Sequence, residues 1–214
     1  MTSSSSSPSP SPSPSSGAVG GLLLFPGAGT DAEHPSLVAI EQAVAQAQAP
    51  GPSGRATAVA RADFPYRRAG RKAPDRAPKL VASVCDEAAA LVASAGIAPD
   101  ALALGGRSMG GRMCSMAVAE GLPAAALVLI AYPLHPPGRP DKLRVDHFPA
   151  LGVPCLFVSG TRDPFGTPDE LEAHTASIAG PVTHVWIDGG RHELKGADER
   201  VAATVRDWLL ALGR

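Results

Sequence analysis

Six short apolar runs, separated by Ala-rich segments with helical spacing, limit the fold of this chain more than any other feature of its sequence. The predicted strands are residues 21–25, 56–64, 101–105, 125–132, 154–160 and 182–188, and the predicted helices are 35–48, 78–95, 109–120, 168–179 and 198–212. Short, continuously apolar strands joined through helices are typical of a parallel sheet covered by helices on both faces. The sequence therefore predicts an α/β fold with a doubly wound, mostly parallel six-stranded sheet.

The length and the N-terminal composition indicate one folded domain behind a tail. At 214 residues the chain can bury one sizeable core but not comfortably two. Residues 1–17 consist almost entirely of Ser and Pro, and such a segment lacks the apolar side chains that would offset its chain entropy. We expect a disordered tail over residues 1–17 and a single domain over residues 18–214.

Charge and cysteine content narrow the partners and cofactors. Lys and Arg number 19 against 20 Asp and Glu, so no net field attracts nucleic acid or an anionic membrane. No apolar stretch approaches the roughly 20 residues of a bilayer span, and no basic segment precedes the first apolar run. Cys85, Cys114 and Cys155 are widely spaced, without a metal-ligand pattern. These features predict a cytoplasmic protein with no nucleic-acid or membrane partner, no metal and no disulfide framework.

Distinctive loops follow four of the predicted strands. Their sequences are PGAGT (26–30), GGRSMGG (105–111), GTRDPFG (160–166) and DGGRHE (188–193). The carboxyl ends of parallel strands meet at one edge of the sheet, and ligands bind at that edge in this fold class. We therefore expect a Gly-rich turn, a serine, an aspartate and a histidine to converge there.

The segment GGRSMGGR (105–112) was compared with two Gly-rich motifs. A phosphate-binding P-loop needs Lys followed by Ser or Thr where this chain has Gly111 and Arg112. A nucleophile elbow needs G-x-S-x-G between a strand and a helix, and residues 106–110 supply it in that context. Side chains at the two flanking glycines would collide with a neighbouring strand and helix. The elbow makes Ser108 the candidate nucleophile and the Met109 amide a candidate oxyanion donor.

A serine hydroxyl needs a base, and the base needs an acceptor that fixes its tautomer. Asp163 and His192 follow Ser108 in one of the chain orders known for such triads, and each comes directly after a predicted strand. Asp188, close to His192 in sequence, is the main alternative acid. Two other acids, Asp169 and Glu170, are interpreted as charges at a helix N-terminus.

The loop after the first strand is the expected source of a second oxyanion donor. Its sequence, PGAGT, offers bare backbone. We assign the donor to the Ala28 amide, with Gly27 and Gly29 as alternatives.

Five motifs in order carry a family resemblance: FPGAGT, GGRSMGGR, YPLHPPG, SGTRDPFG and DGGRHEL. From Gly21 to the C-terminus the chain resembles the α/β-hydrolase superfamily, near dienelactone-hydrolase-like enzymes. More closely, it resembles the small hydrolase-like family named after a testis-expressed protein and a subunit of the nonspecific-lethal complex. The resemblance implies an α/β-hydrolase fold with Ser108, Asp163 and His192 at the triad positions. Because loop 135–147 is too short for a cap domain, we expect an open site.

Two departures from the relatives bear on function. Dienelactone hydrolases have a cysteine nucleophile where this chain has Ser108, which argues against a dienelactone substrate. Many relatives have His-Gly where Pro26 and Gly27 stand, so a differently shaped oxyanion loop is expected. Members of the closer family also serve as parts of larger assemblies. A homo-oligomer and a complex subunit are therefore both left open as states of this chain.

The predicted function is a serine hydrolase that cleaves a small carboxylic ester or thioester through an acyl-enzyme, without metal or organic cofactor. One alternative is a non-catalytic interaction module on the same scaffold. Another is a dinucleotide-binding oxidoreductase, because residues 27–32 fit G-x-G-x-x-[GA] and Asp63 ends the second strand. Pro35 argues against the latter, since it moves the helix start beyond the motif.

The remaining conspicuous side chains have ordinary structural interpretations. Cys114 and Cys155 are expected to be small buried residues and not reactive thiols. Arg107 either orients an anionic substrate or is a solvated or helix-paired arginine. The charges of loop 135–147 are interpreted as wet surface.

Overall fold

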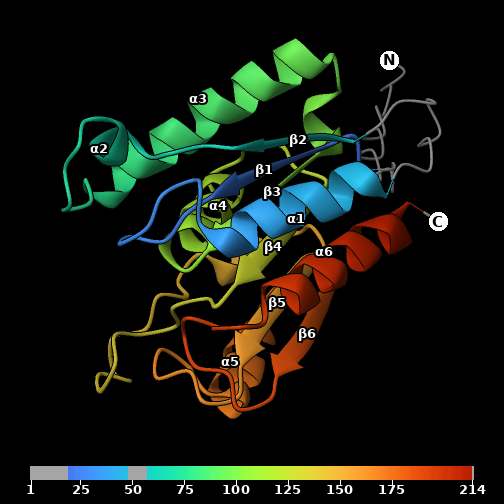
Figure 1. The fold of residues 1–214 in the computed structure, drawn as a ribbon. Coiled ribbons are helices and arrows are strands. Elements are labelled where there is room, and N and C mark those ends of the chain that lie inside the picture. The colour runs from blue at the N-terminus through green and yellow to red at the C-terminus, as the bar shows by residue number, and fades with distance from the viewer. Residues whose placement is uncertain (1–18, 48–56, 214) are drawn as a thin grey trace, which may run out of the picture.

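A six-stranded sheet runs through the molecule, and all of its strand pairs are parallel (Figure 1). The computed structural model describes residues 19–47 and 57–213. The strands are β1 (Gly21–Phe25), β2 (Ala58–Arg61), β3 (Leu102–Arg107), β4 (Ala126–Ile130), β5 (Cys155–Gly160) and β6 (Val182–Ile187), in the spatial order β2-β1-β3-β4-β5-β6. The chain steps outward from β1 to β2 and then returns past β1 to β3. This reversal puts the topological switch point, where such sheets bind ligands, between β1 and β3.

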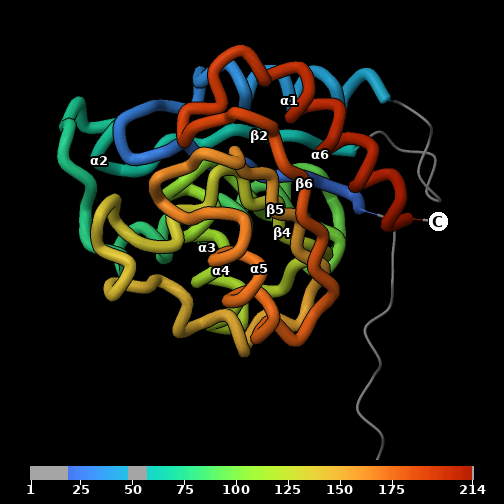
Figure 2. The backbone as a smooth tube through the Cα atoms, turned by 90° about the horizontal axis from the view of Figure 1, so that it is seen from below, coloured from blue at the N-terminus to red at the C-terminus, as the bar shows by residue number. Residues whose placement is uncertain are grey.

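Helices cover both faces of the sheet. They are α1 (Pro35–Gln46), α2 (Pro65–Arg68), α3 (Ala77–Ala95), α4 (Met109–Ala119), α5 (Pro168–Thr175) and α6 (Asp198–Leu212), with short 3-10 segments at Pro99–Ala101 and Phe148–Ala150. Figure 2 shows α1 and α6 side by side on one face and α3, α4 and α5 on the other. The doubly wound α/β fold predicted from the sequence is therefore confirmed.

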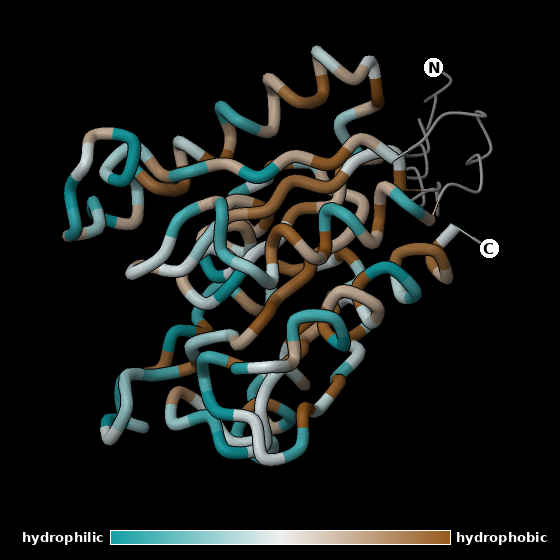
Figure 3. The backbone as a smooth tube through the Cα atoms, in the orientation of Figure 1, coloured by the Kyte–Doolittle hydropathy of each residue, from teal (hydrophilic) through white to brown (hydrophobic). Residues whose placement is uncertain are grey.

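Alternation along the strands divides the core into two layers. Leu22 and Leu24 of β1 pack with α1 and α6, whereas Leu23 and Phe25 pack with the α3 and α4 side, because successive strand side chains point to opposite faces. Strands β1, β3, β4 and β5 are buried throughout, while the edge strands β2 and β6 are mostly half-buried. Figure 3 shows the same contrast as a brown centre within a paler and bluer periphery.

Several element boundaries differ from the predicted ones. Strand β2 ends at Arg61, because the chain leaves the ladder there and enters α2 at Pro65; α2 itself was not predicted. Strand β3 continues beyond residue 105 to Arg107, and α5 ends at Thr175, four residues early. The predicted tail (1–17) and residues 48 and 56 lie outside the described residues. None of the helices in the described part of the chain combines the length and hydropathy that a membrane span needs.

Candidate active site

Ser108 occupies the single position between the end of β3 and the start of α4. Its backbone has φ 50° and ψ −116°, a region that residues with a side chain rarely adopt. The surrounding structure holds this conformation, since the Ser108 N–H donates to the Ile130 carbonyl (2.8 Å) and the Arg112 N–H donates to the Ser108 carbonyl (3.1 Å). The sharp turn directs the hydroxyl out of the sheet edge.

The glycines on both sides of Ser108 are required by close backbone packing. A Cβ built on Gly106 would lie 2.1 Å from the Phe25 carbonyl oxygen, and one on Gly110 would lie 2.3 Å from the same oxygen. Both contacts are with backbone atoms of β1, which cannot rotate away as a side chain can. The predicted collision with a neighbouring strand is therefore confirmed, and that strand is β1.

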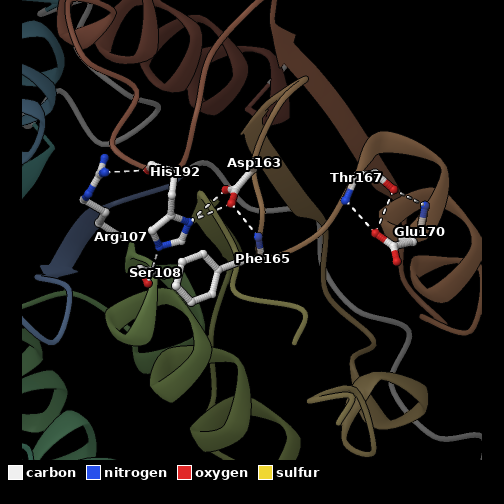
Figure 4. A network of polar contacts seen from close by, with 7 residues as sticks. All are labelled: Arg107, Ser108, Asp163, Phe165, Thr167, Glu170 and His192. Atoms are coloured by element: carbon white, nitrogen blue, oxygen red, sulfur yellow. Dashed lines mark hydrogen bonds and ion pairs between the residues drawn. The ribbon is translucent and has the colours of Figure 1, made fainter. Parts of the chain in front are cut away.

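One continuous hydrogen-bonded chain joins the three residues predicted as a triad (Figure 4). Ser108 Oγ lies 2.9 Å from His192 Nε2, and His192 Nδ1 lies 2.8 Å from Asp163 Oδ2 and 3.0 Å from Oδ1. An ionised carboxylate can only accept, so Asp163 favours the tautomer with the proton on Nδ1. The unprotonated Nε2 then faces the serine hydroxyl.

A tight turn holds Asp163 in this position. The Phe165 N–H donates to Asp163 Oδ1 (2.9 Å), and the Asp163 side chain is 1% exposed. The alternative acid, Asp188, is exposed and accepts a long hydrogen bond from Thr161 Oγ1 (3.4 Å). The structure therefore brings Asp163, and not Asp188, to the imidazole.

Asp169 and Glu170 lie in the first turn of α5, as predicted. Glu170 and Thr167 form a capping box at the start of α5: the Glu170 carboxylate accepts from the Thr167 N–H (2.8 Å), and Thr167 Oγ1 accepts from the Glu170 N–H (3.4 Å). The cap starts α5 directly after the turn that carries Asp163 (Figure 4).

Two contacts that hold His192 were not predicted from the sequence. The Phe165 ring stacks on the imidazole with centroids 4.0 Å apart, and Arg107 Nη2 donates to the His192 carbonyl at 2.6 Å. The position of Phe165, two residues after the acid, was the available signal for the first contact. No sequence signal pointed to the second, because it joins residues 85 positions apart.

The interpretation of Arg107 as a solvated or helix-paired arginine is wrong. The residue is 5% exposed in the wall of the cavity, and Nη1 has no hydrogen-bond partner within the described residues. Burial lowers the pKa of this guanidinium, and nearby carboxylates, Asp198 foremost, oppose that shift. The contact that Arg107 makes is therefore its hydrogen bond to the loop that carries His192, called the histidine loop below.

Backbone amides lie beside Ser108 on two sides. Met109 begins α4 directly after the serine, and the first amides of a helix carry partial positive charge. On the other side, a Cβ on Gly27 would lie 3.7 Å from Ser108 Cβ. In the described part of the chain, neither the Met109 nor the Ala28 N–H donates to another protein atom, so both are available to an oxyanion.

The loop after β1 is fixed by hydrogen bonds from outside it. Tyr66 donates its hydroxyl to the Ala28 carbonyl (2.8 Å), and the Ala32 N–H donates to Asp63 Oδ1 (2.8 Å). Helix α1 begins only at Pro35, so no helix N-terminus directly follows the glycines. Since Asp63 anchors this loop, the dinucleotide interpretation loses both its phosphate-binding helix and its ribose acid.

The serine opens into a cavity of about 510 Å³. Its lining comes from the loop after β1, the start of α4, the loop after β4 and the loops that carry Phe165 and His192: Gly27, Ala28, Gly29, Thr30, His34, Arg107, Ser108, Met109, Arg112, Pro133, Arg144, Phe165, His192 and Glu193. Arg144 belongs to loop 135–147. The interpretation of that whole loop as wet surface is therefore wrong at Arg144, although Arg139 and Lys142 are exposed as expected.

Other reactive side chains lie away from the cavity. Cys114 and Cys155 are fully buried, and burial raises the pKa of both thiols, that of Cys155 to about 12. This confirms their interpretation as small core residues. Within the described residues, no group of three or more His, Cys, Asp or Glu side chains is arranged to hold a metal ion.

Comparison with known proteins identifies the family. The family model for the alpha/beta hydrolase domain matches residues 19–209, and the chain belongs to this family. Among solved structures of similar fold is Est1E from Butyrivibrio proteoclasticus, with 17% identity, a TM-score of 0.67, and coverage of 91% of this chain and 88% of that one. At such low identity, the likeness concerns the fold alone.

Two other solved structures show the same likeness. The RedJ thioesterase of the prodiginine pathway in Streptomyces coelicolor is 19% identical, with a TM-score of 0.63 and 96% of each chain covered. Dienelactone hydrolase from Anabaena variabilis is 20% identical, with a TM-score of 0.68, and the match covers 91% of this chain and 87% of that one. The neighbours of this fold thus include esterases and thioesterases.

Proposed function

We propose that this protein is a serine hydrolase that cleaves a small carboxylic ester or thioester through an acyl-enzyme intermediate. The observation that carries the proposal is the unbroken chain from Ser108 Oγ through His192 to the buried Asp163, which opens at its serine end into a cavity. A strained elbow, a base within hydrogen-bond reach and an acid that orients the base are together the requirements for an activated serine.

In the proposed reaction, Ser108 Oγ attacks the carbonyl carbon while His192 Nε2 accepts the hydroxyl proton. Asp163 remains ionised, holds the imidazole by Nδ1 and stabilises its charged form. The imidazolium then donates the proton to the leaving alcohol or thiol, and the acyl group stays on the serine. A water molecule, deprotonated by the same histidine, hydrolyses the acyl-enzyme and restores Ser108.

The tetrahedral oxyanion is stabilised in this proposal by the N–H of Met109 and a second amide from the loop after β1. We assign the second donor to Ala28, with Gly27 and Gly29 as the alternatives. Both sides of the cavity present backbone amides without protein acceptors. Each such donor typically contributes about 3 kcal/mol to lowering the barrier.

The fold neighbours support an acyl substrate but do not select one. Est1E from Butyrivibrio proteoclasticus has been solved with ferulic acid bound, and RedJ is a thioesterase. Both share only the fold with this chain, so the ester and the thioester stay equal parts of the proposal.

A competing function comes from the closer resemblance, to the family named after a testis-expressed protein and a nonspecific-lethal complex subunit. Members of that family also act as parts of larger assemblies, so a non-catalytic interaction module is the second candidate. The intact hydrogen-bonded chain favours the enzyme, because an interaction module has no need of a strained serine aligned with a base.

Turnover of p-nitrophenyl acetate and butyrate tests the proposal against its competitor. The wild-type chain should hydrolyse at least one of the two esters, and Ser108→Ala should not. A folded wild type with no turnover on esters or on an acyl thioester would overturn the enzyme and favour the interaction module.

A further inference from the structure

We propose that Arg112 and Arg144 form an anion-binding subsite beside Ser108, so that the substrate is an ester or thioester bearing an acidic group, in the simplest case a carboxylate. This inference rests on the proposed hydrolase function and deepens it. Both arginines line the same cavity as the serine.

The two arginines approach the cavity from different elements. Arg112 lies one helical turn after Ser108 on α4, where its N–H donates to the Ser108 carbonyl (3.1 Å). Side chains on a helix lean toward its N-terminus, which is the end of α4 that faces the cavity. Arg144 comes from the loop after β4, and its backbone is held at both ends: its N–H donates to the Leu134 carbonyl (2.9 Å) and its carbonyl accepts from the Tyr132 hydroxyl (2.7 Å).

The positive charges of this pair have no acidic partner in the described part of the chain. Neither arginine forms a salt bridge there, whereas the half-buried Arg61 pairs with Glu33 and Glu41. Arg112 Nε is buried without a hydrogen-bond partner. Burial and the charge of Arg112 lower the pKa of Arg144. Two half-buried like charges side by side are unfavourable unless an anion joins them.

The titratable neighbours of the pair do not supply that anion. Burial raises the pKa of Tyr132, and burial together with Arg112 lowers the pKa of His147 to about 4, so both side chains are uncharged near neutral pH. Asp146 is exposed in the same loop. The buried titratable neighbours of Arg112 and Arg144 are thus neutral.

The acidic residue in the cavity lining, Glu193, belongs to the loop that carries His192. It follows His192 and is exposed, and its charge acts on Arg107. Arg107 is itself engaged with the His192 carbonyl. Arg107 therefore positions the histidine loop, whereas Arg112 and Arg144 are free to bind substrate.

The spacing favours a short substrate. Arg112 lies four residues after Ser108, a rise of about 6 Å along the helix axis. An acidic group a few bonds from the scissile carbonyl, as in a half-ester of a short dicarboxylic acid, suits a separation of this order. Guanidinium groups bind carboxylates through paired, charge-assisted hydrogen bonds.

The test compares two p-nitrophenyl esters with the same acyl chain, the monoester of glutaric acid and the same compound with its free carboxyl methylated. We expect wild-type kcat/KM to favour the acidic ester by about 10-fold or more, mainly through KM. Arg112→Gln and Arg144→Gln should each lower kcat/KM on the acidic ester about 10-fold more than on the methylated one. The matched control is Arg139→Gln, an exposed arginine of the same loop, which should leave the ratio at its wild-type value.

A binding measurement separates this inference from the hydrolase proposal. The melting temperature of Ser108→Ala is measured with increasing glutarate and with dimethyl glutarate; glutarate alone should raise it, and Arg112→Gln in the same background should remove the effect. A chain that binds glutarate through Arg112 but cleaves no ester would overturn the hydrolase and keep the subsite. A chain that cleaves the methylated ester as well as the acidic one, and whose glutarate response survives Arg112→Gln, would overturn the subsite. A larger shift with inorganic phosphate than with glutarate would assign the subsite to phosphate-bearing esters.

Discussion

Two serines of helix α4, one at its N-cap and one within it, each lie at hydrogen-bond distance from a histidine of another segment. In the outer pair, Ser108 Oγ at the N-terminal end of the helix lies 2.9 Å from His192 Nε2. In the inner pair, Ser115 Oγ, two turns further along, lies 2.8 Å from His147 Nε2. Distance alone therefore does not distinguish a candidate nucleophile from a structural contact. The difference lies in what surrounds each pair.

The inner pair lacks every feature that would activate a serine. Ser115 is fully buried and donates its hydroxyl to the Arg112 carbonyl (2.9 Å). Among the described residues no carboxylate is hydrogen-bonded to His147, and burial together with Arg112 lowers its pKa to about 4, so it is a weak base. Ser108, in contrast, has a strained backbone, an acid-oriented base and a cavity. The comparison teaches that acid, strain and access, and not the serine–histidine contact, define the candidate site.

The largest expected effect separates the two serines directly. Ser108→Ala should lower kcat on any ester that the protein hydrolyses by about 10⁵-fold, because the nucleophile and its base act as one unit. Ser115→Ala removes a buried hydroxyl that does not line the cavity and should change kcat by less than about 3-fold. Steady-state kinetics on p-nitrophenyl butyrate measure both. Equal losses in the two variants would break the comparison.

The second-largest expected effect is a loss of kcat on changing Asp163, the acid that is hydrogen-bonded to His192 of the outer pair. Asp163→Asn presents an amide to His192 Nδ1, which favours the tautomer that cannot accept the serine proton, and should lower kcat by about 10³- to 10⁴-fold. Asp188→Asn, at the exposed rival acid, should leave kcat within about 3-fold of wild type. If Asp188→Asn were the more damaging change, the orienting acid would be misassigned.

Much of this arrangement follows from local sequence patterns. The six strands follow from short apolar runs, and the position of Ser108 follows from G-x-S-x-G between a strand and a helix. Asp163 and His192 were predicted because each directly follows a strand, and parallel strands end at one edge. These features depend on residues close together in the chain.

Contacts between distant segments were not predicted. The burial of Arg107 against the His192 carbonyl, the Ser115–His147 pair and the inward position of Arg144 join segments tens of residues apart. An arginine in a loop has the same sequence signature whether it faces solvent or a cavity. Its environment is set by tertiary packing, which single-sequence patterns do not contain.

A third prediction concerns the free energy of unfolding and tests whether the strained turn at Ser108 requires glycine at position 110. Gly110→Ala would place a Cβ 2.3 Å from the Phe25 carbonyl, so the backbone must shift, at a cost of about 3 kcal/mol of unfolding free energy. Gly152→Ala adds a methyl group where no atom lies within 4 Å and should change stability by less than about 0.5 kcal/mol. Urea denaturation compares the two variants, and similar midpoints would contradict the steric account of the elbow.

The smallest effect is a pH dependence of the inner pair. The unfolded chain protonates His147 below its ordinary pKa of 6.5, whereas the folded chain resists protonation until about pH 4. The unfolded state therefore binds more protons in this window, and stability falls as pH drops from 6.5 to 4. His147→Gln should lessen this acid loss by about 1 kcal/mol after allowance for solvent screening. Melting temperatures at pH 7.5 and 5.0 test it, and an equal acid loss in both proteins would contradict a buried neutral His147.

The most direct test of the central claim is labelling with a fluorophosphonate, which reacts covalently with activated serines, followed by peptide mapping of the modified residue. The account predicts one phosphonylated serine, Ser108, with labelling lost in Ser108→Ala and retained in Ser115→Ala. A folded wild type that stays unlabelled, or a label that persists in Ser108→Ala, would contradict the claim that this end of α4 holds an activated nucleophile.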